Sequence, residues 1–141
     1  VGASRTPNMD AAATVDAYYD ALRSGEPLAP FFARDATAKF GIGERLYGFD
    51  EIEAGLTAQT ETTDEWRVES DRLLVTERDD YAWFSDEVAM AWRDLERELD
   101  YEFETRWSGT LERESDAGCD PVGDTPWRFV AMHVSTPGGT R

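Results

Sequence analysis

The chain has 141 residues, of which 40% are apolar and 12% aromatic, so it has the length and the material for one globular domain with a sizeable core. Its 14 basic and 30 acidic residues give a net charge of −16, which argues against nucleic acid and anionic membranes as partners because their phosphates would be repelled. No apolar stretch approaches the roughly 20 residues of a membrane span, and the N-terminal residues lack the apolar centre of a signal peptide, so we expect a soluble, cytoplasmic protein.

Helical spacing marks the beginning of the chain. The residues that recur at intervals of three and four positions are Val15, Tyr18, Tyr19 and Leu22. This spacing predicts an amphipathic helix over residues 10–23, with its aromatic stripe facing the core. Shorter elements follow it, namely a helical turn at residues 27–33 and strands at residues 36–42 and 45–47.

A second helix and then a set of long strands are predicted further on. Asp50 and Glu53 have the spacing of a capping box, which predicts a helix from Asp50 to about Thr60. The periodicity then changes to two, and it predicts strands at residues 66–76, 81–92, 101–113 and 127–136. Helices that precede an antiparallel sheet indicate the α+β class.

Two of these strands carry polar side chains on apolar faces. In the second strand, alternation places Asp86 on the same face as Phe84 and Val88. In the last strand, it places Trp127, Phe129, Ala131, His133 and Ser135 on one face, with Val130, Met132 and Val134 on the other. Because both faces of the last strand are largely apolar, we expect a central strand and a homodimer formed through the outer face of the sheet.

Four clusters of residues carry a resemblance to a known family. They are G-F-D-E-I at residues 48–52, Y-A-W-F at residues 81–84, R-W-S-G-T-L at residues 106–111, and W-R-F-V-A-M-H-V-S at residues 127–135. Through them the chain resembles SnoaL-like members of the NTF2-like superfamily. The chain departs from the pattern at Ala131, where relatives often carry a second histidine.

The resemblance implies an α+β, cystatin-like cone, in which N-terminal helices pack inside a strongly curved mixed sheet of about six strands. A pocket lies between the helices and the sheet in such a cone. We expect one domain at residues 9–137, preceded by a flexible leader at residues 1–8 and followed by a flexible tail at residues 138–141.

The basic residues have an unusual composition, because 13 are arginine and only Lys39 is lysine. An acidic surface with almost no lysine resembles haloarchaeal proteins. Carboxylates keep such a surface hydrated, and at 1 M salt a Debye length of about 3 Å screens their repulsion. We therefore expect a halophilic archaeal source.

Cofactor and metal motifs are not found in the sequence. One histidine and one cysteine cannot form an ordinary zinc site within the chain. Phosphate-loop and serine-hydrolase motifs are also missing, and the glycines at residues 41–48 are misplaced for a dinucleotide loop. We expect no metal and no cofactor.

The resemblance indicates where a catalytic carboxylate would lie. Ketosteroid-isomerase-like relatives need a carboxylate base beside an apolar cavity and a hydrogen-bond donor where negative charge develops. Asp86 could be that base, with Tyr18 or Tyr19 as the donor. Alternatively, a bulge could turn Asp86 to solvent, or Asp86 could form an ion pair with Arg106.

His133, the only histidine, is a third candidate for catalysis. It could act as acid, base or donor near the open end of the cone, within reach of Tyr18 or Tyr19. Alternatively, it could be a neutral structural imidazole that hydrogen-bonds a backbone carbonyl or Ser135. The residues expected to line the pocket are Tyr19, Phe40, Phe84, Trp92, Arg106, Trp107 and Phe129.

Three kinds of function agree with these patterns. The chain could bind or transform a small apolar molecule in the cone, with isomerase, dehydratase or hydrolase chemistry if it is an enzyme. It could be a non-catalytic oligomerisation module, because its closing strand also resembles the calmodulin-kinase association domain. It could also be a stand-alone domain whose main selected property is solubility in salt.

Overall fold

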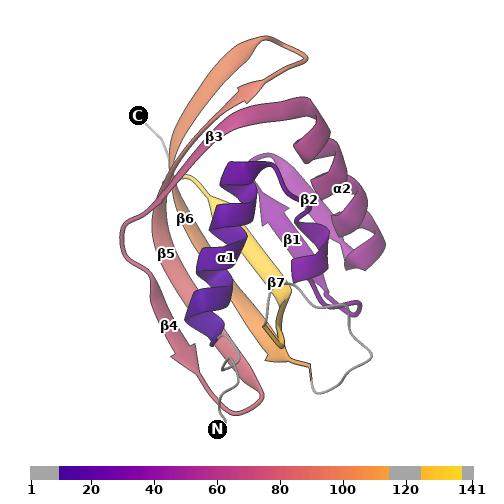
Figure 1. The fold of residues 1–141 in the computed structure, drawn as a ribbon, viewed down its shortest axis with the longest axis vertical. Helices are drawn as coiled ribbons and strands as arrows, with labels where there is room; N and C mark the ends of the chain where they lie inside the picture. Colours follow the sequence, from indigo (N-terminus) through magenta and orange to yellow (C-terminus); the bar gives the residue numbers. More distant parts are fainter. Residues whose placement is uncertain (1–9, 115–124, 138–141) are drawn as a thin grey trace, which may run out of the picture.

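The computed structural model describes residues 10–114 and 125–137. In this part of the chain, one curved sheet wraps around the N-terminal helix, and a second helix lies beside it (Figure 1). The expected leader and tail, and most of the loop before the last strand, lie outside the described residues. No helix in the described part is both long and apolar enough to cross a membrane.

Two α-helices pack on the inner side of the sheet, α1 (Ala11–Ser24) and α2 (Gly48–Thr62), and a 3-10 turn, η1 (Ala29–Phe31), lies between them. Asp10 caps α1 by accepting a hydrogen bond of 2.8 Å from the Ala13 amide. The capping box predicted at Asp50 is wrong, because α2 begins at Gly48. The N-cap residue of α2 is Tyr47, and its amide donates to the Glu51 carboxylate at 2.8 Å.

The sheet has seven strands, one more than expected. They are β1 (Ala38–Gly41), β2 (Glu44–Tyr47), β3 (Thr63–Ser70), β4 (Leu74–Glu77), β5 (Tyr81–Asp94), β6 (Leu99–Arg113) and β7 (Trp127–Ser135). Their order is β2-β1-β7-β6-β5-β3, and β4 also pairs with β5. The β1–β7 pair is parallel and the other described pairs are antiparallel, so the sheet is mixed and the α+β prediction is confirmed. The strand predicted at residues 66–76 is interrupted at residues 71–73, which separates β3 from β4.

A bulge in β7 reverses the face that its side chains present to the interior. Leu111 pairs with Phe129 and Thr110 pairs with Ala131, so Val130 is an extra residue on β7. Since side chains alternate along a strand, one extra residue moves all later side chains to the opposite face. The predicted common face of the last strand is therefore wrong beyond Phe129.

As a result, apolar residues of β7 are buried both before and after the bulge. Trp127 and Phe129 are buried before it, and Met132 and Val134 are buried after it. The apolar character of both faces, from which a homodimer was expected, thus reflects a change of face within one strand. The homodimer stays a prediction.

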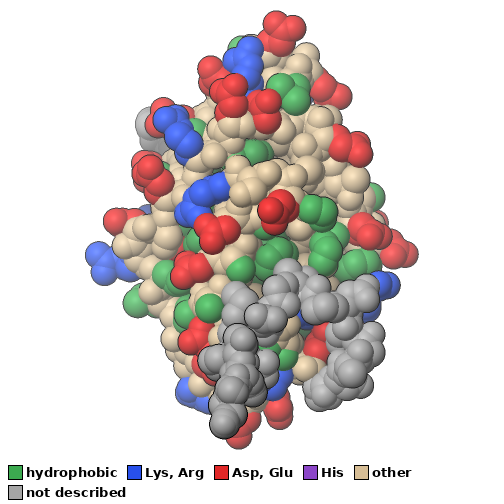
Figure 2. Space-filling model, viewed as in Figure 1, with side chains coloured by type: hydrophobic (Ala, Val, Ile, Leu, Met, Phe, Trp, Pro, Cys, Tyr) green, Lys and Arg blue, Asp and Glu red, His purple; other side chains and the backbone are tan. Residues whose placement is uncertain are grey.

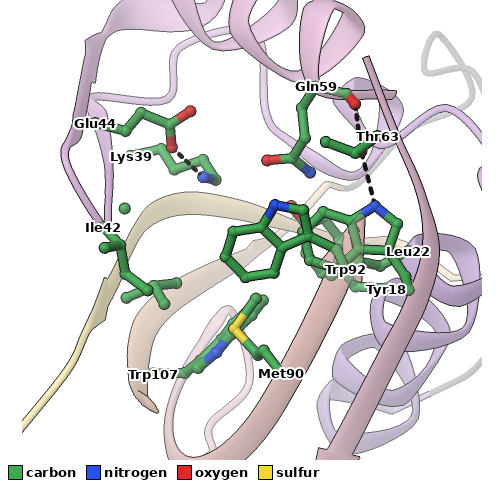
Figure 3. Close-up of a pocket in the computed structure, with 13 residues that line it drawn as sticks. Tyr18, Leu22, Lys39, Ile42, Glu44, Gln59, Thr63, Met90, Trp92 and Trp107 are labelled. Carbon is green, nitrogen blue, oxygen red and sulfur yellow. Dashed lines mark hydrogen bonds and ion pairs between the residues drawn. The ribbon is translucent and has the colours of Figure 1, made fainter. Parts of the chain in front are cut away.

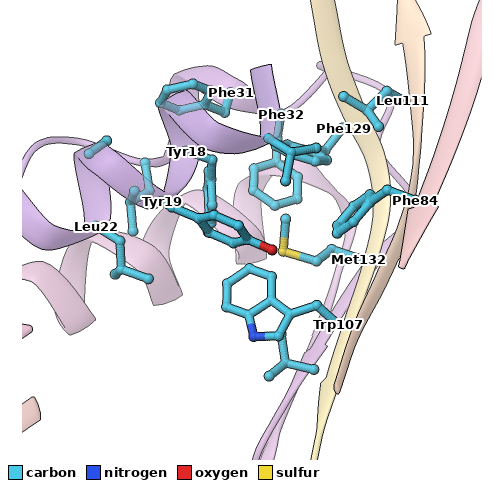
Figure 4. Close-up of a cluster of buried hydrophobic side chains, with 14 of the residues drawn as sticks. Tyr18, Tyr19, Leu22, Phe31, Phe32, Phe84, Trp107, Leu111, Phe129 and Met132 are labelled. Carbon is cyan, nitrogen blue, oxygen red and sulfur yellow. The ribbon is translucent and has the colours of Figure 1, made fainter. Parts of the chain in front are cut away.

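An aromatic core lies between α1 and the sheet (Figure 4). Tyr18 of α1 lies at its centre, and its ring makes edge-on contacts with four other rings at centroid distances from 5.3 to 6.1 Å. These partners are Phe31, Phe32, Trp107 and Phe129. Such contacts each add about 0.5–1.5 kcal/mol beyond the area they bury, so they anchor α1 against the sheet.

Acidic side chains are scattered over the described part of the face shown in Figure 2, without forming a single patch. Few basic side chains lie between them on that face. The excess of acidic over basic side chains agrees with the net charge of −16.

Candidate functional site

A cavity of about 120 Å³ lies between α1, α2, the β1–β2 hairpin and the inner face of the sheet. Its apolar walls come from Tyr18, Leu22, Met90, Trp92, Trp107 and Val134. An apolar cavity of about 150 Å³ can hold benzene. The space at the open end of this cone is therefore of the size that takes a small, flat molecule.

One basic side chain, that of Lys39, lines this cavity. It pairs with Met132 in the parallel β1–β7 register, so it lies on the inner face of the sheet, and only 5% of it is exposed. Its Nζ atom lies 2.5 Å from the Oε1 atom of Glu44 on β2. Figure 3 shows the two side chains pointing toward one another at one side of the cavity, with Trp92 opposite them. The only lysine of the chain is thus buried beside aromatic walls.

Gly41 makes room for this ion pair. It stands opposite Glu44 in the β1–β2 register, and a Cβ atom at residue 41 would lie 2.6 Å from Oε1 of Glu44. A larger residue would therefore push the carboxylate away from Lys39. With glycine at residue 41, the Glu44 side chain can lie across the hairpin and reach the ammonium group of Lys39.

Tyr18 adds a hydroxyl group to the same cavity. Burial, and secondly the charge of Glu44, raise the pKa of Tyr18 well above its ordinary value. The hydroxyl therefore stays protonated and can donate a hydrogen bond. Within the described part of the chain, the hydrogen bonds found do not use it.

The raised pKa values of Tyr18 and Tyr19 predict a loss of stability at alkaline pH. Below the ordinary tyrosine value of 10.0 the stability is fully present. Above it only the unfolded chain releases these protons, so the free energy of unfolding falls as the pH rises. The midpoint of thermal unfolding, followed by circular dichroism, should drop steeply in alkaline buffer. A variant with both residues changed to phenylalanine should show a shallower drop, whereas Tyr81→Phe, at an exposed position, should behave like the parent.

Asp86 of β5 is buried beside the interruption between β3 and β4. Its Oδ2 atom accepts hydrogen bonds from the hydroxyls of Tyr19 at 2.8 Å and Ser70 at 2.6 Å. Its Oδ1 atom accepts one from the backbone amide of Arg72 at 2.9 Å. Asp86 and Tyr19, which the sequence proposed as base and donor, do lie together. Their contact ties α1 to the interrupted edge of the sheet. Asp86 does not line the cavity between the helices and the sheet, and it lines a separate groove with Arg106 and His133.

The ion pair considered between Asp86 and Arg106 is not found among the described residues. Asp86 faces the interior and is only 3% exposed, whereas the next residue of β5, Glu87, and its cross-strand partner Arg106 are exposed on the other face. The bulge considered at Asp86 is not found either, because β5 and β6 pair there in regular register.

His133 lies on the outer face of the sheet, so the prediction that it points into the cone is wrong. The bulge at Val130 is the reason. His133 is exposed and meets the ring of Phe40 edge-on at 5.8 Å. Together with Arg106 it lines a shallow outer groove of about 370 Å³. The expected contact of its imidazole with Tyr18 or Tyr19 does not form, because those side chains are on the inner side.

The residues predicted to line the pocket separate into three groups. Trp92 and Trp107 do line the cavity. Tyr19, Phe84 and Phe129 belong to the buried core. Phe40 and Arg106 point to the outer side of the sheet, as their register neighbours His133 and Ser135 do.

Stacked aromatic rings form the rim of the cavity. The rings of Trp66 and Trp92 lie 4.8 Å apart and nearly parallel. Trp92 also contacts Tyr101 and Phe103 on the β5–β6 hairpin, which projects beyond the rest of the sheet (Figure 1). Trp66 is held in place by a hydrogen bond from its indole nitrogen to the Thr63 hydroxyl at 2.8 Å. Trp66 and Trp92 thus line the cavity from β3 and β5.

Sequence reasoning missed four polar residues of this cavity, which are Lys39, Glu44, Gln59 and Thr63. A signal for Lys39 was available, because it is the only lysine and strand alternation places it on the opposite face from Phe40. The scarcity of lysine indicated a property of the protein surface, and it did not point to a buried lysine. The partner carboxylate could not be identified among 30 acidic residues without the hairpin register.

Comparisons with known proteins agree with the cone. The sequence profile of the SnoaL-like domain matches residues 11–138. No curated protein matches the chain significantly.

Solved structures of low sequence identity share the fold. An NTF2-like putative dehydratase from Streptomyces avermitilis superposes with a TM-score of 0.75 at 12% identity, over 92% of this chain and 95% of that one. A putative calcium/calmodulin-dependent protein kinase type II association domain from Thiobacillus denitrificans has a TM-score of 0.69 at 17% identity, over 95% and 100%. A ketosteroid isomerase-like protein from Erwinia carotovora has a TM-score of 0.68 at 14% identity, over 91% and 94%. These likenesses show an NTF2-like fold.

Proposed function

This chain belongs to the SnoaL-like domain family, and we propose that it binds a small, largely apolar molecule in the cavity of its cone. Lys39, Glu44 and Tyr18 form the polar end of the proposed site. Trp92 and Trp107 form its flat walls.

The burial of the only lysine carries this proposal. The other 13 basic residues are arginine, and among the described residues Lys39 is the one basic residue that lines the cavity. A buried ion pair contributes little net stability, because removing both charges from water offsets their attraction. A role in recognition explains why this pair is kept between aromatic walls.

The charges and donors of the site describe its ligand. The carboxylate of Glu44 balances the ammonium group of Lys39, which favours a neutral molecule over an anion. The ammonium group has three protons and uses one for Glu44, and Tyr18 offers another donor. A flat molecule that carries one oxygen acceptor would satisfy these donors and fill the space against the tryptophans.

Proton transfer is the chemistry that this arrangement supports if the bound molecule reacts. Glu44 can accept a proton from the ligand, and Lys39 and Tyr18 can stabilise the oxygen on which negative charge develops. Isomerisation and dehydration can both use a base of this kind beside hydrogen-bond donors. Two of the similar structures are named as a putative dehydratase and a ketosteroid isomerase-like protein.

The test is binding of acetophenone, a small aromatic ketone, followed by quenching of tryptophan fluorescence. We expect the parent to bind it and Lys39→Met to bind it at least about tenfold more weakly, because a hydrogen bond from a charged donor is lost. Arg67→Met is the matched control, since Arg67 is exposed on β3 and does not line the cavity. Equal affinity of the parent and Lys39→Met would contradict the proposal, as would no binding by the parent to any small aromatic ketone or phenol.

A further inference from the structure

We infer that Lys39 is a reactive amine, which captures a small aromatic aldehyde or ketone as an imine inside the cavity. The inference rests on the proposed function, because the carbonyl compound must enter the same cavity. It goes further in assigning a covalent bond to one atom, the Nζ of Lys39.

The geometry around Nζ places a proton acceptor directly beside the amine. A nucleophile with a base within hydrogen-bonding distance is the arrangement that covalent catalysis uses. Nζ of Lys39 and Oε1 of Glu44 are 2.5 Å apart. The ammonium group must lose a proton before it can attack, and the Glu44 carboxylate is placed to accept it.

The β1–β2 hairpin holds the proton acceptor, Glu44, in its position beside Lys39. Glu44 reaches Lys39 across the narrow β1–β2 hairpin, and only a glycine at residue 41 leaves space for its carboxylate. The side chain of Lys39 is 7% exposed and that of Glu44 is 27% exposed. The amine is therefore enclosed, while the carboxylate remains in contact with solvent, with which it can exchange protons.

The bond changes balance without a further reactant. The ammonium proton moves to Glu44, the nitrogen lone pair attacks the carbonyl carbon, and the carbonyl π electrons move to oxygen. The oxygen takes up the proton from Glu44 and the nitrogen gives up a second proton to the carboxylate, which yields a neutral carbinolamine. Return of that proton to the hydroxyl releases water as the C=N bond forms. Tyr18 can donate a hydrogen bond to the oxygen during the attack.

The walls of the cavity select the class of carbonyl compound. Trp107 and Met90 face Trp92 across the space beside Lys39 (Figure 3). A volume of about 120 Å³ suits a single aromatic ring better than a polycyclic molecule. An aldehyde on such a ring can place its carbon against Nζ while the ring packs between the apolar side chains.

The experiment uses benzaldehyde and sodium cyanoborohydride, which reduces an imine to a stable secondary amine. We expect the intact mass to increase by one benzyl group, and peptide mapping to place this group on Lys39. Because Lys39 is the only lysine, the one other amine to exclude is the terminal one. Lys39→Arg should keep the charge and show no adduct in the cavity.

Two variants separate the reactive site from ordinary lysine chemistry. Glu44→Gln should trap benzaldehyde at least tenfold more slowly, because the proton acceptor is lost, and its affinity for benzaldehyde, measured in parallel by tryptophan quenching, separates slower trapping from weaker binding. Arg67→Lys in the Lys39→Arg background adds an exposed lysine outside the cavity, and its adduct should form at least tenfold more slowly than that of Lys39. Equal rates for the two lysines would overturn the inference, as would an unchanged rate in Glu44→Gln.

The failure of this inference is distinguishable from failure of the proposed function. Reversible quenching by acetophenone and benzaldehyde without any adduct on Lys39 would overturn the imine and leave the binding proposal standing. An absence of both quenching and adduct would overturn both. Adduct formation that acetophenone inhibits by competition, with no adduct in Lys39→Arg, would support both.

Discussion

Asp86→Ala should lower the free energy of unfolding by about 3–5 kcal/mol, because three hydrogen-bond donors lose their common acceptor. These neutral donors are the hydroxyls of Tyr19 and Ser70 and the backbone amide of Arg72. Each of them costs about 1–3 kcal/mol when it is left unsatisfied. They hold α1 and the interruption between β3 and β4 to the middle of β5. Urea unfolding followed by circular dichroism measures the change, and an unchanged slope with urea would show that it arises in the folded state.

Two further variants serve as controls for Asp86. Tyr19→Phe removes one donor and leaves the carboxylate, so it should lose only about 1–2 kcal/mol. Asp86→Asn keeps the shape and one acceptor oxygen, so its loss should lie between those of the other two variants. If Asp86→Ala were as stable as the parent but failed to turn over a ligand that it still bound, Asp86 would be a catalytic base and the structural assignment would be wrong.

Gly109→Ala should destabilise the fold by about 3 kcal/mol, at the upper end of what overpacking causes. A Cβ atom at residue 109 would lie 2.6 Å from the carbonyl oxygen of Ala131 and 2.8 Å from the ring of Phe84. The first contact is with the backbone next to the bulge in β7, and the second is with a buried core ring. Neither group can move away without disturbing the bulge or the core.

Ser108→Ala is the matched control for Gly109→Ala. Ser108 is the preceding residue of β6 and it is exposed on the outer face, so this change should stay within about 0.5 kcal/mol of the parent. Thermal unfolding of the two variants under identical conditions gives the comparison. A Gly109→Ala protein as stable as the Ser108→Ala protein would mean that β7 does not approach β6 in this way.

Local patterns were sufficient for most elements of the fold. The three- and four-residue spacing that includes Tyr18 and Leu22 predicted α1 to within a residue at each end. Strand alternation predicted β5, β6 and β7, and the order of helices and strands predicted the α+β class. These features depend on which residues face the core within one segment, and this information is present in the segment itself.

The site was predicted only in part, because its geometry depends on how distant segments pair. Alternation assigned His133 to the interior, but the extra residue Val130 reverses the face of β7, and this bulge exists only through the pairing with β6. Similarly, the long strand expected after α2 is divided where Asp86 accepts hydrogen bonds from Ser70 and Arg72.

The sequence by itself determined the fold class, the family resemblance and which aromatic residues are available for the core, because periodicity and motif are local properties of the chain. Only the tertiary structure decided which polar groups share an interior. The parallel register of β1 with β7 turns Lys39 inward, and the turn of the hairpin brings the Glu44 carboxylate onto it across Gly41. Burial of a charge is a property of its surroundings, and those surroundings form only when segments far apart in sequence are packed together.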